Sequence, residues 1–311
     1  MIFDAKLTEK EIKNKRMSLQ LNQQMVRDAL KGAVGQLPAL PNVLVRILQL
    51  TEDSNSGSVA EIENLIKSDQ AISSRLLRVV NSSYFGLGGK VASVNQAVVI
   101  LGFQQVRSIV LSTSLLSNFG SSGEKHQELQ MKLWRHAFAT ASAAQHIGRK
   151  KRLGAKEMDF VFVAGLLQNI GCLFILSVLS RSYSALLCEA YNTGRRVVDI
   201  ENERLGLNHS EVGGEILAKW GLPEDLVSLI NSHEGPFEAE LDPLVAVVHC
   251  ADRIGDLVER DQAFNLDMLD LSLPVWDSLS LDAELLEEAW SQAKEKVHAA
   301  MELFASGDQA A

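Results

Sequence analysis

The chain has few cysteines, and no secretory signal is expected from its first residues. Its 311 residues include 3 cysteines, Cys172, Cys188 and Cys250, none of them in a Cys-x-x-Cys spacing. This isolation excludes a disulfide framework and a zinc knuckle, and it favours reduced, buried thiols. No cationic segment followed by an apolar one opens the chain, so a secretory signal is not expected. The cytoplasm is therefore the expected compartment.

An excess of positive charge is also absent. Lys and Arg number 30 against 39 Asp and Glu, which gives a net charge of −9. This balance repels a phosphate backbone, so neither nucleic acid nor an anionic membrane is expected as a partner. The basic run at 149–152 is interpreted as a solvated helix end, where cations complement the helix dipole.

Two common catalytic motifs and any clear strand pattern are missing as well. The stretch 86–90 resembles a phosphate-binding loop but lacks the G-x-x-x-x-G-K-[ST] spacing, and no G-x-S-x-G elbow occurs. Hydrophobic periodicity instead predicts helices almost throughout, in a soluble globular chain of 46% hydrophobic and 22% charged residues. The expected fold class is all-α.

The helices are expected to form two lobes. An amphipathic N-terminal helix (1–31) ends in a break over 32–41, and a first helical lobe occupies 32–120. Within this lobe Ser93-Val94-Asn95-Gln96 predicts a capped helix start, and a further helix is expected over 103–116 after a break at Gly102. The small polar segment 118–123 is the best candidate for a junction. A second helical lobe with a C-terminal helical extension fills 121–311, and its last helix is expected over 282–304.

Residues 160–180 form a run of 21 uncharged residues, long enough to span a bilayer. Gln168 and Asn169 lie near its midpoint, and polar groups inside a membrane are rare and costly. We therefore favour a buried central helix, expected over 156–179. Two buried carboxamides side by side need hydrogen-bond partners, so this pair marks a site or the remnant of one.

Several residues of the second lobe could bind a divalent cation, which needs imidazole and carboxylate ligands. They are His136, His209, His233, His249 and Asp252. Four of these five also have a structural interpretation. His136 could be a core histidine, His209 could stand at a helix N-terminus and His233 at a helix C-terminus, and Asp252 could belong to a solvated ion pair with Arg253.

A set of motifs along the chain resembles the HDOD family of bacterial signalling proteins. The motifs are Leu37-Pro38-Ala39-Leu40-Pro41, Arg75-Leu76-Leu77-Arg78-Val79-Val80-Asn81-Ser82, Asn95-Gln96-Ala97, the Gln168-Asn169 segment, Asn208-His209-Ser210-Glu211 and Trp220-Gly221-Leu222-Pro223. They cover roughly residues 35–235, and their combination is specific although each is weak alone. One departure is Asp69-Gln70, where the family commonly has Asp-Pro. The resemblance implies a two-lobe helical protein whose second lobe is a bundle like that of the HD phosphohydrolases.

The resemblance also extends to the HD-GYP phosphohydrolases, whose metal ligands can be carried across. His136 falls on the first ligand histidine, Gln168-Asn169 on the His-Asp pair, and His209 on a later histidine. Residues 232–234 fall on a His-His-Glu motif and retain His233, while Asp252 falls on the final aspartate. Four of seven ligand positions thus remain, and Gly235-Pro236 does not reproduce the Gly-Tyr-Pro loop.

The loss of the central His-Asp pair implies a regulatory module rather than an enzyme. The expected ligand-binding cleft comprises His136, Gln168, Asn169, His209, His233 and Asp252, with no cofactor required. A residual divalent metal would use His136, His209, His233 and Asp252. Expected partners are a small nucleotide-like ligand or a signalling protein, such as a response regulator or a diguanylate cyclase domain. The alternatives are a residual metal-dependent phosphohydrolase acting on nucleotides or cyclic dinucleotides, and a pure scaffold.

Overall fold

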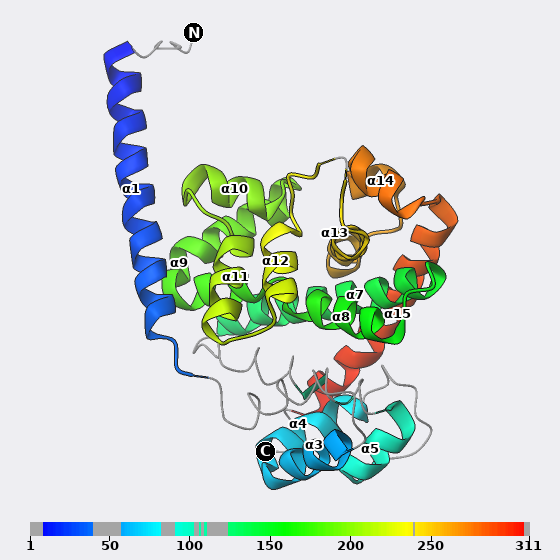
Figure 1. Cartoon of the computed structure of the whole chain (residues 1–311). Helices are drawn as coiled ribbons and strands as arrows, with labels where there is room; N and C mark the ends of the chain where they lie inside the picture. Colours follow the sequence, from blue (N-terminus) through cyan, green and yellow to red (C-terminus); the bar gives the residue numbers. More distant parts are fainter. Residues whose placement is uncertain are drawn as a thin grey trace.

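The computed structural model describes residues 9–39, 57–81, 91–102, 106, 109, 110, 124–238 and 240–307, and these contain helices and no strand. The all-α expectation is confirmed. Figure 1 shows a large helical bundle, a smaller group of helices below it and a long N-terminal helix along one side.

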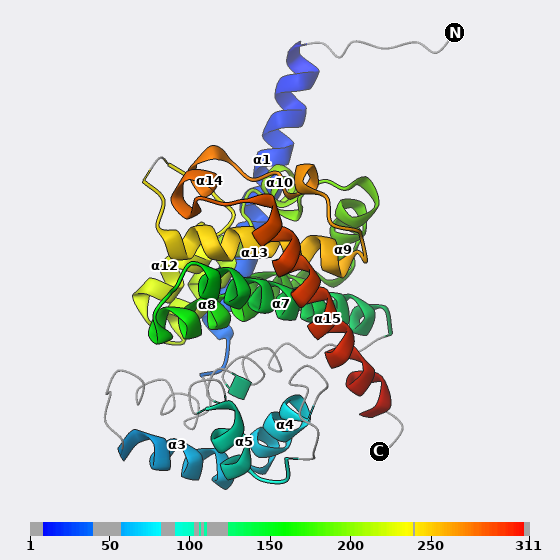
Figure 2. The same ribbon diagram turned by 90° about the vertical axis from the view of Figure 1, so that its right-hand side faces the viewer.

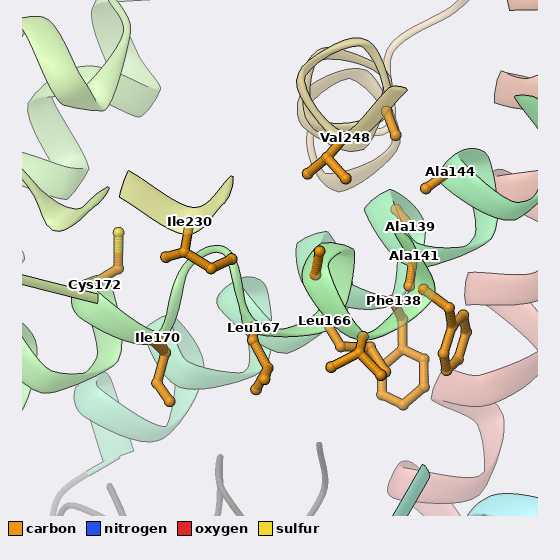
Figure 3. Close-up of a cluster of buried hydrophobic side chains, with 14 of the residues drawn as sticks. Phe138, Ala139, Ala141, Ala144, Leu166, Leu167, Ile170, Cys172, Ile230 and Val248 are labelled. Atoms are coloured by element: carbon orange, nitrogen blue, oxygen red, sulfur yellow. The ribbon is translucent and has the colours of Figure 1, made fainter. Parts of the chain in front are cut away.

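The centre of the bundle is formed by α7 (Glu124–Lys150), α8 (Ala155–Leu167) and α13 (Pro243–Glu259). α7 carries a run of small buried residues that includes Ala139, Ala141 and Ala144, and these allow its neighbours to approach closely (Figure 3). At the crossing with α8, a Cβ on Gly165 would lie 2.8 Å from the Ala141 Cα. Alanine and glycine therefore set the spacing of the helices that position the site.

The apolar segment expected as one helix over 156–179 is divided, and that expectation was wrong. α8 ends at Leu167, Gln168 and Asn169 form a turn, and α9 (Ile170–Thr193) begins with Asn169 as its N-cap. The break lets α9 pack directly on α11 (His209–Lys219). Gly171 makes this possible, because a Cβ there would lie 1.9 Å from the His209 carbonyl oxygen. The two amides thus occupy a turn between helices.

The same segment is the one stretch of the described residues long and apolar enough to cross a membrane. It spans residues 155–193, and 83% of its most apolar window is buried inside the protein. Its α8 half packs against α7, α12 and α13 and its α9 half against α7, α10 and α11, as expected for core helices.

Further helices surround the centre. They are α10 (Val197–Arg204), α12 (Glu224–Ser232), the 3₁₀ turn η3 (Leu266–Leu269), α14 (Leu273–Leu279) and α15 (Ala283–Gly307). α15 packs along α7 and α13, and Figure 2 shows it continuing toward the small helical group. The expected C-terminal amphipathic helix is therefore present. The sequence predicted neither α10 nor α14.

The small group contains α3 (Gly57–Ser68), α4 (Gln70–Val80) and α5 (Val94–Leu101). Ser93 caps α5 as the sequence predicts, and its side chain accepts a hydrogen bond from the Gln96 backbone N–H. Asn81 joins the end of α4 to the chain before α5 through hydrogen bonds to Val91 in both directions. The expected junction at 118–123 and most of the helix expected over 103–116 lie outside the described residues.

The N-terminal helix α1 (Glu9–Gln36) does not end at residue 31 but continues through Gly32 and Gly35 to Gln36. Its C-terminal half packs on α9 and α11 of the large bundle. Lys219 donates hydrogen bonds to the carbonyls of Val34 and Gly35 and so holds the last turn in place. This external support for the last carbonyls explains why the helix runs past its glycines.

Candidate functional site

One half of the candidate site joins three helices through a buried polar cluster. His136 lies on α7, Asp252 on α13 and Gln168 at the end of α8, and their exposed fractions are 7%, 4% and 0%. The His136 Nε2 lies 2.7 Å from the Asp252 Oδ1. Gly255 leaves room for this ring, since a Cβ there would lie 3.2 Å from the His136 Cε1.

The Gln168 amide closes this cluster. Its Nε2 lies 2.6 Å from the Asp252 Oδ1, 3.0 Å from the His136 Nε2 and 3.3 Å from the Thr140 Oγ1. The nitrogen faces Asp252 because an amide oxygen there would meet a carboxylate oxygen without a hydrogen between them. The Gln168 Oε1 is buried without a hydrogen-bond partner among the described residues. The amide N–H2 group thus donates to Asp252 and Thr140 and fills the space beside His136 that an ion would need.

His136 and Asp252 stabilise each other's charged forms. Burial by itself lowers the pKa of His136, but the hydrogen bond and charge of Asp252, helped by Asp256 and Glu259, raise that pKa to about 9. Burial by itself raises the pKa of Asp252, but His136 reverses this and holds that pKa well below its ordinary value. The alternative interpretation of Asp252 as half of a solvated pair with Arg253 is wrong, because Asp252 is buried and Arg253 contacts Asp256 at 2.8 Å.

The second half of the site centres on His209. This residue is the first of α11, so it does lie at a helix N-terminus. Its Nδ1 lies 2.7 Å from the Glu201 Oε2, and its backbone N–H donates to the same oxygen at 3.0 Å. Glu201 is fully buried on α10 and also accepts a hydrogen bond from the Tyr183 hydroxyl. Burial opposes the charged form of His209, yet Cys172 and Glu201 raise its pKa well above the ordinary value.

His233 and Glu234 face His209 from the end of α12. The His233 ring is fully buried, and its Nδ1 donates to the Ile230 carbonyl at 2.7 Å, which leaves its Nε2 without a partner. The rings of His209 and His233 meet edge to face with centroids 5.4 Å apart. The Glu234 Oε1 lies 3.6 Å from the His209 Nε2, while Arg196 binds its other oxygen. One ligand atom from each of His209, His233 and Glu234 lies within 4.8 Å of the others.

Asn169 and His249 lie at the margins of the two halves. Asn169 lines the cavity described below and accepts a hydrogen bond from the Cys172 thiol at 3.7 Å. His249 donates from its Nδ1 to the His233 carbonyl at 2.7 Å and packs edge to face on Phe237. Burial lowers the pKa of His249 to about 4, so this ring is neutral at pH 7 and holds the His233 backbone in place.

A cavity of about 300 Å³ joins the two halves. His136, Asp252 and Asn169 line it on one side, and His209 and Glu234 on the other. The structure thus brings four of the six predicted site residues to the lining of this cavity, while Gln168 lies behind His136. His233 does not line the cavity but reaches it through its contact with His209.

The outer wall of the cavity carries an aromatic ring with two cations near it. Tyr191 is 44% exposed, and the Lys132 Nζ and the Arg260 guanidinium lie 4.4 and 5.8 Å from its ring centroid. Lys132 also pairs with Glu128 at 3.5 Å, whereas Arg260 has no ion pair within the described part of the chain. Arg260 is thus a cation available to a ligand at the edge of an aromatic surface.

The four ligands that the resemblance implied for a metal do not form one set. His136 and Asp252 already pair with each other, and the Gln168 N–H2 group beside them donates to Asp252 and Thr140. An ion there would have to displace this donor, so the pair does not fit a metal. His209 and His233 do fit, because each has its Nδ1 hydrogen bonded to an acceptor and its buried Nε2 without a partner.

Sequence reasoning missed several residues of the site. Glu201 and Arg196 lie on or before α10, a helix too short for a periodic signal. Tyr191 lies near the end of α9, where nothing in the sequence marks it as a site residue. The alternation of charges in 195–204 (RRVVDIENER) shows a polar helix face, but nothing in it marks Glu201 as buried. Its role depends on α10 folding back on α9.

Comparison with known proteins places this arrangement in a class of all-helical domains. The HDOD domain model matches residues 37–236. The chain therefore belongs to the HDOD family, and the resemblance in the sequence is confirmed.

Solved structures share the fold. An HDOD domain protein of unknown function from Geobacter sulfurreducens is 22% identical, with a TM-score of 0.70, and the alignment covers 92% of this chain and 99% of that one. A "putative phosphohydrolase" from Shewanella amazonensis is 21% identical, with a TM-score of 0.65, covering 88% and 98% of the two chains. A "putative signal transduction protein" from Marinobacter aquaeolei has the same TM-score and identity, and covers 91% and 65%.

A curated relative gives little further guidance. An uncharacterized protein from Treponema pallidum is 25% identical over 229 residues, which are 71% of this chain and 42% of the relative. The chain thus spans less than half the length of this relative. At these identities the structural matches establish the fold, and the function has to be argued from the site itself.

Proposed function

We propose that the chain is a non-catalytic signalling module that binds a small nucleotide-like anion in the cavity between His136 and His209. The main support is the Gln168 amide, which donates to Asp252 and Thr140 and lies against His136 where a hydrolase of this class needs an ion. An amide group supplies neither a Lewis acid nor an activated water. Recognition remains because the cavity beside the amide is retained.

The cavity lining suits a nucleotide. Its volume of about 300 Å³ lies at the lower end of ligand pockets, which favours one nucleotide over a dinucleotide. Tyr191 offers a ring on which a base can stack, and Arg260 and Lys132 beside it can pair with phosphate. Ligand occupancy would then be passed on to a signalling partner such as a response regulator or a diguanylate cyclase domain.

A binding and turnover experiment tests this proposal. Nucleoside mono- and triphosphates and cyclic dinucleotides are titrated by calorimetry, and hydrolysis is followed with Mn²⁺ present. We expect a nucleotide to bind without turnover, and Tyr191→Ala to weaken binding by about 10- to 100-fold, the usual range for loss of one base stack. Arg260→Gln should also weaken binding, whereas Arg195→Gln, at an exposed arginine outside the cavity, should not. Enzyme-like hydrolysis that His136→Ala abolishes would refute the proposal.

A second candidate function, a residual metal-dependent phosphohydrolase, is favoured by one observation. The unpartnered nitrogens of His209 and His233 and the Glu234 carboxylate lie next to the cavity. Such an enzyme would hydrolyse a nucleotide only with added metal and would lose turnover in His209→Asn. If turnover is absent at every metal tested, this candidate is excluded.

A further inference from the structure

A buried cluster on α10, α11 and the end of α12 has the donor arrangement of a metal site. His209, at 2% exposed, and His233, at 0%, each have an Nε2 without a hydrogen-bond partner within the described part of the chain. A buried polar atom left unpaired costs about 1 to 3 kcal/mol. Two such nitrogens beside one carboxylate therefore suggest a ligand that satisfies both.

The Nδ1 hydrogen bonds of the two rings leave the Nε2 atoms as the nitrogens that can bind an ion. The His209 Nδ1 lies 2.7 Å from Glu201, and the His233 Nδ1 lies 2.7 Å from the Ile230 carbonyl. Hydrogen bonds of this kind fix the ring orientation and tautomer of metal-binding histidines, and an ion at the His209 Nε2 would take the place of the proton there.

The spacing agrees with one ion. Ligand atoms about 2.1 Å from a tetrahedral ion lie about 3.4 Å apart. The His209 Nε2 and the Glu234 Oε1 are 3.6 Å apart, which is too long for a hydrogen bond and close to this value. Arg196 binds the other oxygen of Glu234 and holds the carboxylate toward the histidines.

We propose that His209, His233 and Glu234 together bind one divalent transition-metal ion, such as Zn²⁺ or Fe²⁺, without His136 or Asp252. Two imidazoles and one carboxylate are a common donor set for such ions. His209 and Glu234 both line the cavity, so the ion has an open side toward it. This inference does not depend on the proposed nucleotide function, because it requires no nucleotide.

A neighbouring group of possible ligands is less suitable. Cys172, Glu201 and His209 also have ligand atoms within 4.8 Å of one another. There, however, Glu201 is already hydrogen bonded to the His209 Nδ1 and to Tyr183. An ion at that position would break both contacts, so Glu201 is the outer partner of His209 and not a ligand.

The test uses the full chain, stripped with a chelator and titrated with Co²⁺, a probe whose visible absorption reports its coordination. We expect one Co²⁺ per chain with nitrogen and oxygen ligands, displaced by Zn²⁺. His209→Asn and His233→Asn each keep an amide N–H in the place of Nδ1–H and remove Nε2. Each should weaken Co²⁺ binding by more than about 100-fold. This is more than the loss expected when only the hydrogen-bond partner of a ligand histidine is changed. Glu201→Gln, which changes that outer partner, should cost about 10- to 100-fold.

Two further histidine variants separate this site from the one that the resemblance implied. His136→Asn removes the imidazole on the opposite side of the cavity and should leave the Co²⁺ affinity and spectrum unchanged. His146→Asn, on α7 beside Glu288, is the matched control for loss of a histidine. Circular dichroism checks the fold of every variant, and Glu234→Gln replaces any variant that does not fold. The proposal is overturned if the folded wild-type chain binds no Co²⁺, or if His136→Asn weakens binding as much as His233→Asn.

Discussion

Replacement of Gln168 by glutamate is the sharpest test of its amide contacts, because it exchanges a donor N–H2 group for an acidic oxygen of nearly the same shape. The new oxygen would stand where the Gln168 Nε2 now lies, 2.6 Å from the Asp252 Oδ1 and 3.0 Å from the His136 Nε2. At an effective dielectric constant of 20, the repulsion from Asp252 and the attraction to a protonated His136 are each about 6 kcal/mol and nearly cancel. The cost of burying a further charge, several kcal/mol, therefore decides the outcome.

The folded protein avoids this cost by keeping the Gln168→Glu carboxyl protonated, since its O–H can then donate to Asp252 as the amide does. An unfolded glutamate has a pKa of about 4.3, and each pH unit above it costs about 1.36 kcal/mol. The variant should thus lose about 3.7 kcal/mol of unfolding free energy at pH 7 and only about 1 kcal/mol at pH 5. The sign follows because a carboxyl with a raised folded pKa loses stability as the pH rises.

Urea unfolding at pH 5, 6 and 7, with a chelator present, measures this difference. Gln168→Met is the matched control, because it keeps the length of the side chain and cannot titrate. The difference between the two variants should widen by about 2.7 kcal/mol from pH 5 to pH 7. A constant difference over this range, or a Gln168→Glu protein as stable as the wild type at pH 7, would show that Gln168 does not donate to Asp252.

Three other perturbations follow from the structure. Gln168→His combined with Asn169→Asp should create a second metal position, seen as an additional Co²⁺ bound per chain; no gain would mean that the cavity has diverged from the hydrolases. Gly171→Ala should lower the free energy of unfolding by more than about 3 kcal/mol or prevent folding, because its Cβ would lie 1.9 Å from the His209 carbonyl oxygen. Gly35→Ala is the matched control, since a Cβ there meets nothing within 4 Å. It should stabilise α1 by up to about 1 kcal/mol, measured by thermal unfolding. Burial lowers the pKa of His249 to about 4, so His249 should reduce the free energy of unfolding by about 3 kcal/mol as the pH falls from 6.5 to 4. Urea unfolding of His249→Asn over the same pH range should show a loss smaller by this amount.

The fold was largely predictable because its strongest signals are local. Ser93 and Gln96 predicted the start of α5, and the apolar spacing of the C-terminal segment predicted α15. The break at Gln168 was not predictable from periodicity, since apolar residues continue on both sides of it. It depends on Gly171 meeting the backbone of α11, a contact between residues distant in sequence.

The sequence predicted which residues belong to the site but not which of them contact one another. A single template named His136, His209, His233 and Asp252 together, and the structure does place them around one cavity or its wall. The sequence could not show that His136 and Asp252 are tied to Gln168, or that Glu201 orients His209. Both facts depend on which side-chain atom faces which neighbour, and residue type alone does not specify this.

The two halves of the site differ in whether they can hold an ion, and the reason is physical. Gln168 carries its own donor, so His136 and Asp252 remain satisfied without an ion and their cluster becomes part of the core. No amide donor lies beside His209 and His233 in the described part of the chain, and their unpartnered Nε2 atoms lie next to Glu234. A single ion there could hold one end of an anionic ligand in the cavity. It would lack the second ion that clamps the attacking and leaving oxygens in two-metal phosphohydrolysis. Metal binding by this half and the proposed absence of turnover are therefore compatible, and the Co²⁺ and hydrolysis assays test them separately.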